Sequence, residues 1–271
     1  MEEPNIEFIE SFLSKYKGGE IKLQKQYWDE GIALICINHV EKKNAISGKM
    51  MVDLRTCIKE LEQWRTGKAV IMYGAGTNFC SGGDLAFARA ESNPTAGSYM
   101  SLYMHETLKK FRNLPFVTFS LVHGPALGGG SELAVFCDYT IVSDTVQLGF
   151  VHEKMGIITA WGGTSRLVRI VGERRALEML LSGGIHDARD CFNIGLAYKI
   201  VRNDRRLEET LDFVRTFTNS HYSVLQSYKR IANSDGESSF GEALRVERNE
   251  FWPKWGSEVN KEALHRNIKH L

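Results

Sequence analysis

The sequence lacks any long apolar run, and its charges almost cancel. The longest unbroken apolar stretch, Ile32 to Ile37, has six residues, whereas a membrane-spanning helix needs about 20. Lys and Arg together number 34 against 33 Asp and Glu, a net charge of +1, so no excess of one sign indicates a nucleic acid or membrane surface as a partner. With 43% hydrophobic and 25% charged residues, the composition is typical of a globular chain and excludes a disordered or fibrous one. We expect neither a membrane nor a nucleic-acid partner, although a local basic pocket for one phosphate stays open.

The cysteines show no pattern that would serve a disulfide framework or a zinc site. There are five, an odd number, and no Cys-x-x-Cys occurs. Most stand beside apolar residues, where a free thiol behaves as a small hydrophobe. We therefore expect no metal and a reducing compartment. The start, Met1-Glu2-Glu3-Pro4, has neither the basic and apolar stretches of a signal peptide nor the Arg-rich character of a transit peptide, so the expected location is cytoplasmic.

Several well-known catalytic motifs are also missing. The sequence has no Gly-x-Gly-x-x-Gly, no Gly-x-x-x-x-Gly-Lys-Ser/Thr and no His-Glu-x-x-His, and Ser131 lacks the flanking spacing of a nucleophile elbow. These absences count against Rossmann dehydrogenases, P-loop NTPases, zincins and α/β-hydrolases.

What is present is an alternation of apolar strands and amphipathic helices. The patterns predict strands at 31–38, 69–73, 116–122 and 139–142, and helices at 5–16, 47–65, around 104–111 and at 130–137. Strands alternating with helices favour an α/β fold with a largely parallel sheet. After about residue 200, helical spacing recurs at 205–219, 222–232 and 238–252, and no strand is predicted there. We expect an α/β core over 1–200, with a short N-terminal helix, and a helical extension over 201–271.

Two glycine-rich turns stand out, each after a predicted strand. The first is Asn78 to Leu85 and the second is His123 to Leu133, which leads into a helix. Glycine lets a ligand approach the backbone closely, and a helix N-terminus presents unpaired N–H groups that favour negative charge. Two such donors converging on one oxygen would form an oxyanion hole, worth roughly 3–4 kcal/mol per donor. Each turn taken alone is equally compatible with an ordinary strand-to-helix connection.

The two turns together, with Glu132 one turn into the helix, resemble the crotonase (enoyl-CoA hydratase/isomerase) family. The resemblance runs from about residue 20 to the C-terminus and includes 38–45, 79–85, 124–133 and 161–167. It implies a spiral of ββα units, with C-terminal helices that build a homotrimer, often paired into a dimer of trimers. It also implies an acyl-CoA thioester as substrate, whose carbonyl oxygen binds the N–H groups of Gly83 and Gly129.

The same resemblance indicates residues that contact CoA and the acyl group. For CoA these are Lys42, Lys43, Ala45, Asp84 and Leu85, with Lys229, next to Arg230, reaching the nucleotide phosphate across a subunit contact. For the acyl pocket they are Trp161, Ile157 and Ile158. Lysines are also common on solvated loops, and apolar residues usually belong to a core. CoA enters only as part of the substrate, and no metal or redox cofactor is expected.

The position of the second catalytic group decides which member of the family this chain resembles. Hydratases of the family use two glutamates. Glu132 matches the first, but the second position, four residues before Gly156 and ten before the Gly162-Gly163 pair, is His152. Glu153 would occupy this second position only if the loop were shifted by one residue. The segment Phe150 to Ile158, with Trp161 beyond it, resembles the animal decarboxylases that act on ethylmalonyl-CoA and methylmalonyl-CoA.

The chemistry of decarboxylation agrees with a histidine at this position. Loss of CO₂ from a malonyl thioester leaves an enolate whose charge collects on the thioester oxygen. A glutamate facing the substrate carboxylate at about 5 Å would repel it by roughly 3 kcal/mol at an effective dielectric of about 20, and His152 removes that repulsion while supplying a donor. The alternative reading of His152 is a hydrogen-bonded core residue.

Glu132 has three interpretations under this hypothesis. It is protonated and hands a proton to the enolate carbon, or it holds water or a neighbouring side chain, or it only stabilises the helix dipole. Two other functions stay open: a hydratase or isomerase that uses Glu132, and a catalytically silent CoA- or RNA-binding scaffold. The presence of Gly83, Gly129 and Glu132 counts against the silent scaffold.

Overall fold

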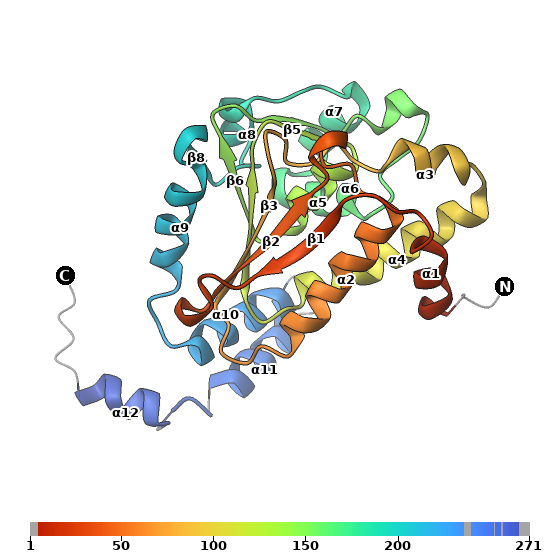
Figure 1. Ribbon diagram of the computed structural model, residues 1–271. Helices are drawn as coiled ribbons and strands as arrows, with labels where there is room; N and C mark the ends of the chain where they lie inside the picture. Colours follow the sequence, from red (N-terminus) through yellow and green to blue (C-terminus); the bar gives the residue numbers. More distant parts are fainter. Residues whose placement is uncertain (1–4, 236–239, 252, 256, 266–271) are drawn as a thin grey trace.

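The protein is built on a six-stranded sheet with a second, two-stranded sheet beside it (Figure 1). The computed structural model describes residues 5–235, 240–251, 253–255 and 257–265. The large sheet has the order β1 (Glu20–Gln24), β2 (Ile32–Asn38), β3 (Ala69–Gly74), β4 (Val117–Val122), β6 (Tyr139–Ser143) and β8 (Lys199–Val201). All neighbours are parallel except β1 and β2. The small sheet pairs β5 (Pro125–Leu127) with β7 (Gln147–Gly149) in parallel.

Helices surround both sheets. Those of the first part of the chain are α1 (Ile6–Leu13), α2 (Gly48–Glu62), α3 (Leu85–Ala90), α4 (Pro94–Arg112) and α5 (Gly129–Phe136). Those that follow are α6 (Gly163–Val171), α7 (Glu173–Ser182), α8 (Ala188–Asn193), α9 (Arg206–Phe217), α10 (Tyr222–Asp235), α11 (Phe240–Phe251) and α12 (Glu258–His265). Short 3₁₀ helices lie at Trp28–Glu30, Val40–Lys42, His152–Met155 and Asn203–Arg205. No helix among the described residues is long and apolar enough to cross a membrane.

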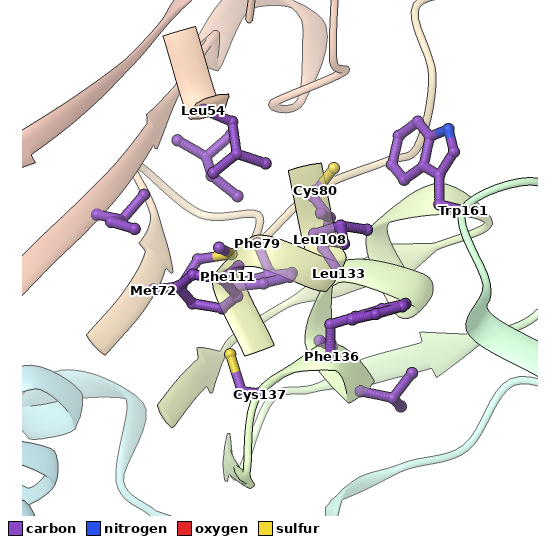
Figure 2. Close-up of a cluster of buried hydrophobic side chains, with 14 of the residues drawn as sticks. Leu54, Met72, Phe79, Cys80, Leu108, Phe111, Leu133, Phe136, Cys137 and Trp161 are labelled. Atoms are coloured by element: carbon purple, nitrogen blue, oxygen red, sulfur yellow. The ribbon is translucent and has the colours of Figure 1, made fainter. Parts of the chain in front are cut away.

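The large sheet is buried on both faces, which explains its unbroken apolar strands. Successive side chains along β2 point to opposite faces of the sheet. Ile35 and Ile37 face the larger core, and Ile32 and Leu34 face the smaller one. Figure 1 shows α9 along one face and α2 and α4 along the other. Figure 2 shows part of the larger core, where side chains from α2, β3, α4 and α5 meet around Phe79.

Most predicted helices and strands are found within a few residues of their expected bounds, but the helix predicted around 104–111 begins ten residues earlier, at Pro94. Helices α3, α6, α7, α8 and α12 and four strands were not predicted. The edge strand β1 has only two apolar residues, Ile21 and Leu23. Strands β5, β7 and β8 have three residues each, which is too short for a period to show. Of the helix predicted at 238–252, residues 238, 239 and 252 lie outside the described residues.

The boundary predicted at residue 200 falls inside β8. Helix α9, the first of the predicted extension, contributes Leu211 and Val214 to the smaller core. It therefore belongs to the body of the α/β fold, because it covers the face of the sheet opposite α2 and α4. Helix α12 extends away from that body (Figure 1).

Candidate active site

Hydrogen bonds bring the two glycine-rich turns side by side. The Leu127 N–H donates to the Cys80 carbonyl at 3.0 Å, which aligns the second turn with the first. The turns approach so closely that a Cβ atom on Gly82 would lie 3.3 Å from the Gly129 nitrogen. The backbone at Ile46 pairs with the first turn. The Ile46 N–H donates to the Gly82 carbonyl at 2.8 Å, and the Asp84 N–H donates to the Ile46 carbonyl at 2.9 Å.

The N–H groups of Gly83 and Gly129 are both available in this arrangement. Within the described residues, no acceptor takes the Gly83 N–H, and Gly129 is the first residue of α5, so its N–H has no helical acceptor. A Cβ on Gly83 would meet no described atom within 4 Å, so this N–H borders open space. A Cβ on Gly129 would lie 2.5 Å from the Trp161 ring, so only glycine fits there. The preceding residue, Gly128, has φ 53° and ψ −122°, a conformation open to glycine.

Glu132 is held by the third glycine-containing turn. Its side chain is 1% exposed. Oε2 accepts the N–H groups of Trp161 at 2.9 Å and Gly163 at 2.8 Å, and Oε1 accepts that of Ala160 at 3.2 Å. A Cβ on Gly163 would lie 2.5 Å from Glu132 Cγ, so the turn closes directly on the glutamate. The carboxylate is thereby fixed between α5 and the start of α6.

His152 completes a buried pair with Glu132. Its side chain is 8% exposed, and Nε2 lies 3.1 Å from Glu132 Oε1. Nε2 also lies 3.9 Å from the position of a Cβ on Gly128, which places this nitrogen beside the Gly129 N–H. Nδ1 is buried and makes no hydrogen bond within the described part of the chain.

Glu153 points away from this pair. It is exposed, and its carboxylate lies so close to Gly183 that a Cβ there would be 1.9 Å from Glu153 Oε1. The structure therefore places His152, and not Glu153, against Glu132. No slip of the loop brings Glu153 into the site.

The hypothesis that Glu132 is protonated and donates to the substrate finds no support in this geometry. Three backbone N–H groups already approach its two oxygens. Among the described residues, the neighbouring atom that could accept a hydroxyl proton is His152 Nε2, 3.1 Å from Oε1, so a protonated Glu132 would donate to the histidine. The arrangement fits the second interpretation, in which Glu132 holds a neighbouring side chain, here His152.

Trp161 separates the site from the core. It is buried, and its ring lies over Gly129. Its indole N–H donates to Met100 Sδ at 2.9 Å, and Figure 2 shows it at the margin of the apolar cluster. Ile157 and Ile158 are 56% and 82% exposed and line a hollow that also contains Met100 and Gly97 of α4. No local pattern in the sequence points to Met100 or Gly97, because they are more than 50 residues away from the loop they face.

Five of the six predicted CoA contacts gather beside the Gly83 turn. Lys42 Nζ lies 2.9 Å from Asp84 Oδ2, and the Ser81 N–H donates to the Lys43 carbonyl. Burial raises the pKa of Asp84, but the hydrogen bonds from Lys42 and the Ala86 N–H outweigh it, so the net pKa is below the ordinary value. The Ala45 carbonyl lies 2.7 Å from His39 Nδ1. Leu85, half exposed, begins α3 directly after Asp84.

Lys229 does not join this group. Its side chain is buried, and its Nζ pairs with Asp138 after the end of α5. Burial lowers the pKa of this lysine, and Asp138 opposes the effect. Arg230 pairs with Glu250 at 2.7 Å. An amino group held in this way connects α10 to the core and is not directed toward the Lys42 region of the same chain, while the expected contact across a subunit interface stays a prediction.

A protein with a buried Glu–His pair beside two glycine N–H groups that have no acceptor in the described part of the chain is suited to bind an oxygen that gains negative charge. The sequence matches the enoyl-CoA hydratase/isomerase family over residues 28–266, and the chain belongs to that family. This confirms the predicted family.

Curated relatives and solved structures cover nearly the whole chain. The sequence is 37% identical over 264 residues to an ethylmalonyl-CoA decarboxylase of Xenopus laevis, covering 97% of this chain and 88% of that protein. It is 36% identical over 266 residues to one of Homo sapiens, covering 97% and 86%. An enoyl-CoA hydratase of Bacillus anthracis has the same fold, with a TM-score of 0.83 at 23% identity over 90% of this chain and 94% of that one. A Thermobifida fusca protein in complex with acetoacetyl-CoA gives 0.77 at 25% identity over 87% and 94%. The predicted α/β fold of this family is thereby confirmed, while assembly through the C-terminal helices stays a prediction.

Proposed function

We propose that this chain is an acyl-CoA decarboxylase that removes CO₂ from 2-alkylmalonyl thioesters, namely ethylmalonyl-CoA and methylmalonyl-CoA. The observation that carries the proposal is the contact of His152 Nε2 with Glu132 Oε1 beside Gly128. A hydratase of this family would need a second glutamate there. The relatives named ethylmalonyl-CoA decarboxylase support the same activity.

Gly83 and Gly129 stabilise the oxygen that becomes negatively charged during the reaction. Their N–H groups donate to no acceptor among the described residues and would bind the thioester oxygen. The bond between C2 and the carboxylate breaks, its electron pair becomes an enolate, and CO₂ leaves. Preorganised donors lower the energy of that enolate more than that of the substrate, which is the condition for catalysis.

The proton that C2 then needs is assigned to His152. As an imidazolium it carries a hydrogen on both nitrogens. It transfers a ring proton to C2 and remains as the neutral imidazole, to be protonated again from solvent. Its positive charge also attracts the substrate carboxylate before CO₂ is lost. Glu132 touches His152 and not the substrate in this scheme, so it is a positioning residue.

CoA is assigned to the edge formed by Lys42, Lys43, Ala45, Asp84 and Leu85. The support is their location next to Gly83 and the solved relative that holds acetoacetyl-CoA. The reaction as written needs no metal or redox group, so turnover should survive treatment with a chelator.

The proposal extends to the assembly and the compartment. We infer a homotrimer or a dimer of trimers in the cytoplasm. Helices α7 and α8 and the turn between them expose apolar side chains that an interface would cover: Leu177, Leu181, Ile185 and Phe192. Sedimentation of the purified chain measures the assembly, and microscopy of the tagged protein shows the compartment.

The decisive experiment separates decarboxylation from hydration. Purified protein is mixed with ethylmalonyl-CoA, methylmalonyl-CoA and crotonyl-CoA in turn, and the products are weighed by mass spectrometry. We expect the malonyl thioesters to lose CO₂ and crotonyl-CoA to stay unchanged. Addition of water to crotonyl-CoA alone would contradict the proposal and indicate a hydratase. His152→Ala should lower the decarboxylation rate at least 100-fold, as loss of a general acid does, while the same change at the exposed His221 should not.

A further inference from the structure

A hollow opens between the first turns of α4 and the segment that follows His152. Its volume is about 700 Å³. The lining residues are Gly97, Met100, Glu153, Gly156, Ile157, Ile158 and Ala160. Glu153 is the charged member of this set, and most of the remaining surface is apolar.

The hollow is connected to the reacting centre through its inner wall. Ala160, one of the lining residues, donates its N–H to Glu132 Oε1 at 3.2 Å. Met100, another, accepts the indole N–H of Trp161 at 2.9 Å, and Trp161 covers Gly129. These contacts place the hollow directly behind the residues that hold Glu132 and cover Gly129.

Two features keep the hollow open and apolar. Gly97 lies within α4, where glycine destabilises a helix relative to alanine, yet a Cβ there would meet no described atom within 4 Å. The side chains of Ile157 and Ile158 are 56% and 82% exposed, so they offer apolar surface that a bound alkyl chain would cover. Glu153 disfavours the substrate carboxylate in the hollow, which leaves that carboxylate to His152.

We propose that the hollow binds the 2-alkyl branch of the substrate and that the enzyme consequently decarboxylates 2-alkylmalonyl thioesters with branches longer than ethyl, including propyl and butyl. This inference rests on the proposed function. Pockets of about 300–1,000 Å³ hold ligands of drug size, so the hollow greatly exceeds an ethyl group. Gly97 is the residue that sets the permitted length, because any larger side chain there would extend into the hollow.

The first test compares four substrates with the wild-type chain. We expect kcat/KM for butylmalonyl-CoA to be at least one tenth of that for ethylmalonyl-CoA, with methyl- and propylmalonyl-CoA measured alongside. Each methylene that is buried can strengthen binding by about fourfold, which offsets the added length. A value below one tenth overturns the inference. If none of the four loses CO₂, the proposed function itself fails, whereas release from the methyl and ethyl substrates alone contradicts only the assignment of the hollow.

The second test changes Gly97 and uses a matched glycine as control. Gly97→Leu should lower the ratio of kcat/KM for butylmalonyl-CoA to that for methylmalonyl-CoA at least tenfold. Gly241 is also a helical glycine whose Cβ would meet no described atom within 4 Å, but it is not among the lining residues, so Gly241→Leu should keep the ratio. Gly97→Ala adds one methyl group that would meet no described atom within 4 Å. It tests whether a substitution at this position disturbs folding, and it should change the ratio less than threefold. An unchanged ratio in Gly97→Leu would refute the role of this residue.

Discussion

Glu132 carries a carboxylate at 1% exposure, a placement that costs free energy unless both oxygens are hydrogen-bonded. The N–H groups of Ala160, Trp161 and Gly163 and the ring of His152 meet that need. One side chain thus fixes the third turn and the histidine together. This explains why a glutamate is present in a decarboxylase that has no evident use for a general base.

Replacing Glu132 with glutamine should therefore impair both folding and turnover. The amide NH₂ of Glu132→Gln would face backbone N–H donors or the His152 ring, leaving a buried donor without an acceptor, which costs about 1–3 kcal/mol. We expect the free energy of unfolding to fall by that amount in a denaturant titration and kcat to drop more than tenfold. Glu153→Gln, on the neighbouring exposed side chain, is the control and should stay within about 0.5 kcal/mol. Wild-type stability and rate in Glu132→Gln would exclude a positioning role.

The register of His152 could be predicted from the sequence, whereas the partner of Trp161 could not. Counting back from Gly156 and Gly162 depends on a continuous loop, and the structure keeps that loop intact. Met100 reaches Trp161 from a helix 61 residues away in the chain. No local period or motif reports such a contact, because it depends on how α4 packs over the site.

At the scale of elements, the two glycine-rich turns use their glycines for different reasons. Gly129 is closely packed, since a Cβ would lie 2.5 Å from the Trp161 ring. Gly83 faces open space. Packing alone therefore requires glycine at position 129, whereas no packing contact among the described residues requires it at position 83, where the proposed approach of the thioester would.

This difference predicts opposite outcomes for two alanine substitutions. Gly129→Ala forces Trp161 to move and should lower the free energy of unfolding by about 1–3 kcal/mol, as overpacking does. Gly83→Ala should keep wild-type stability, yet lose at least tenfold in kcat/KM because its methyl group enters the space meant for the thioester. Thermal unfolding and steady-state kinetics on both variants distinguish the roles. Equal loss of stability in the two would contradict the distinction.

Helices and strands could be predicted correctly where burial produces a regular pattern of apolar residues along the sequence. Strands such as β2 and β3 are buried on both faces and appear as unbroken apolar runs, and α2 shows its buried residues at intervals of three and four. Strands β5 and β7 pair with each other across 22 residues of chain, and they also bridge Cys80 and His186, respectively. Their existence depends on tertiary contact, and no pattern within three residues could reveal it.

At the scale of the whole molecule, one buried ion pair attaches the C-terminal helices to the core. Lys229 of α10 pairs with Asp138, which also accepts the backbone N–H and the hydroxyl of Thr118. Gln226 adds hydrogen bonds to the carbonyls of Arg65 and Gly67. These contacts join α10 to segments that flank two strands of the sheet.

Removing the lysine should loosen that attachment. Lys229→Met removes one of two cations beside Asp138, because Arg112 Nη1 still lies 3.6 Å from the same carboxylate, so we expect the free energy of unfolding to fall by about 1–3 kcal/mol. Because Lys229 is not directed toward the CoA edge, we expect KM for ethylmalonyl-CoA to change less than twofold once folded protein is selected. Lys42→Met, which removes the cation beside Asp84, is the comparison and should raise KM. A large increase of KM in Lys229→Met would restore the contact with CoA that the sequence suggested.

The stability of the whole molecule should also depend on pH through His123, between β4 and β5. Burial, and next the nearby Arg206, lower the pKa of His123 to about 4, whereas in the unfolded chain it is about 6.5. Below pH 6.5 the unfolded chain therefore binds a proton that the folded protein does not. This lowers the free energy of unfolding by about 1.4 kcal/mol per pH unit, or about 3 kcal/mol in all by pH 4. His123→Gln cannot titrate, so the difference in unfolding free energy between wild type and variant should shrink by that amount from pH 7 to pH 4. A difference that stays constant over this range would mean that His123 is protonated equally in both states.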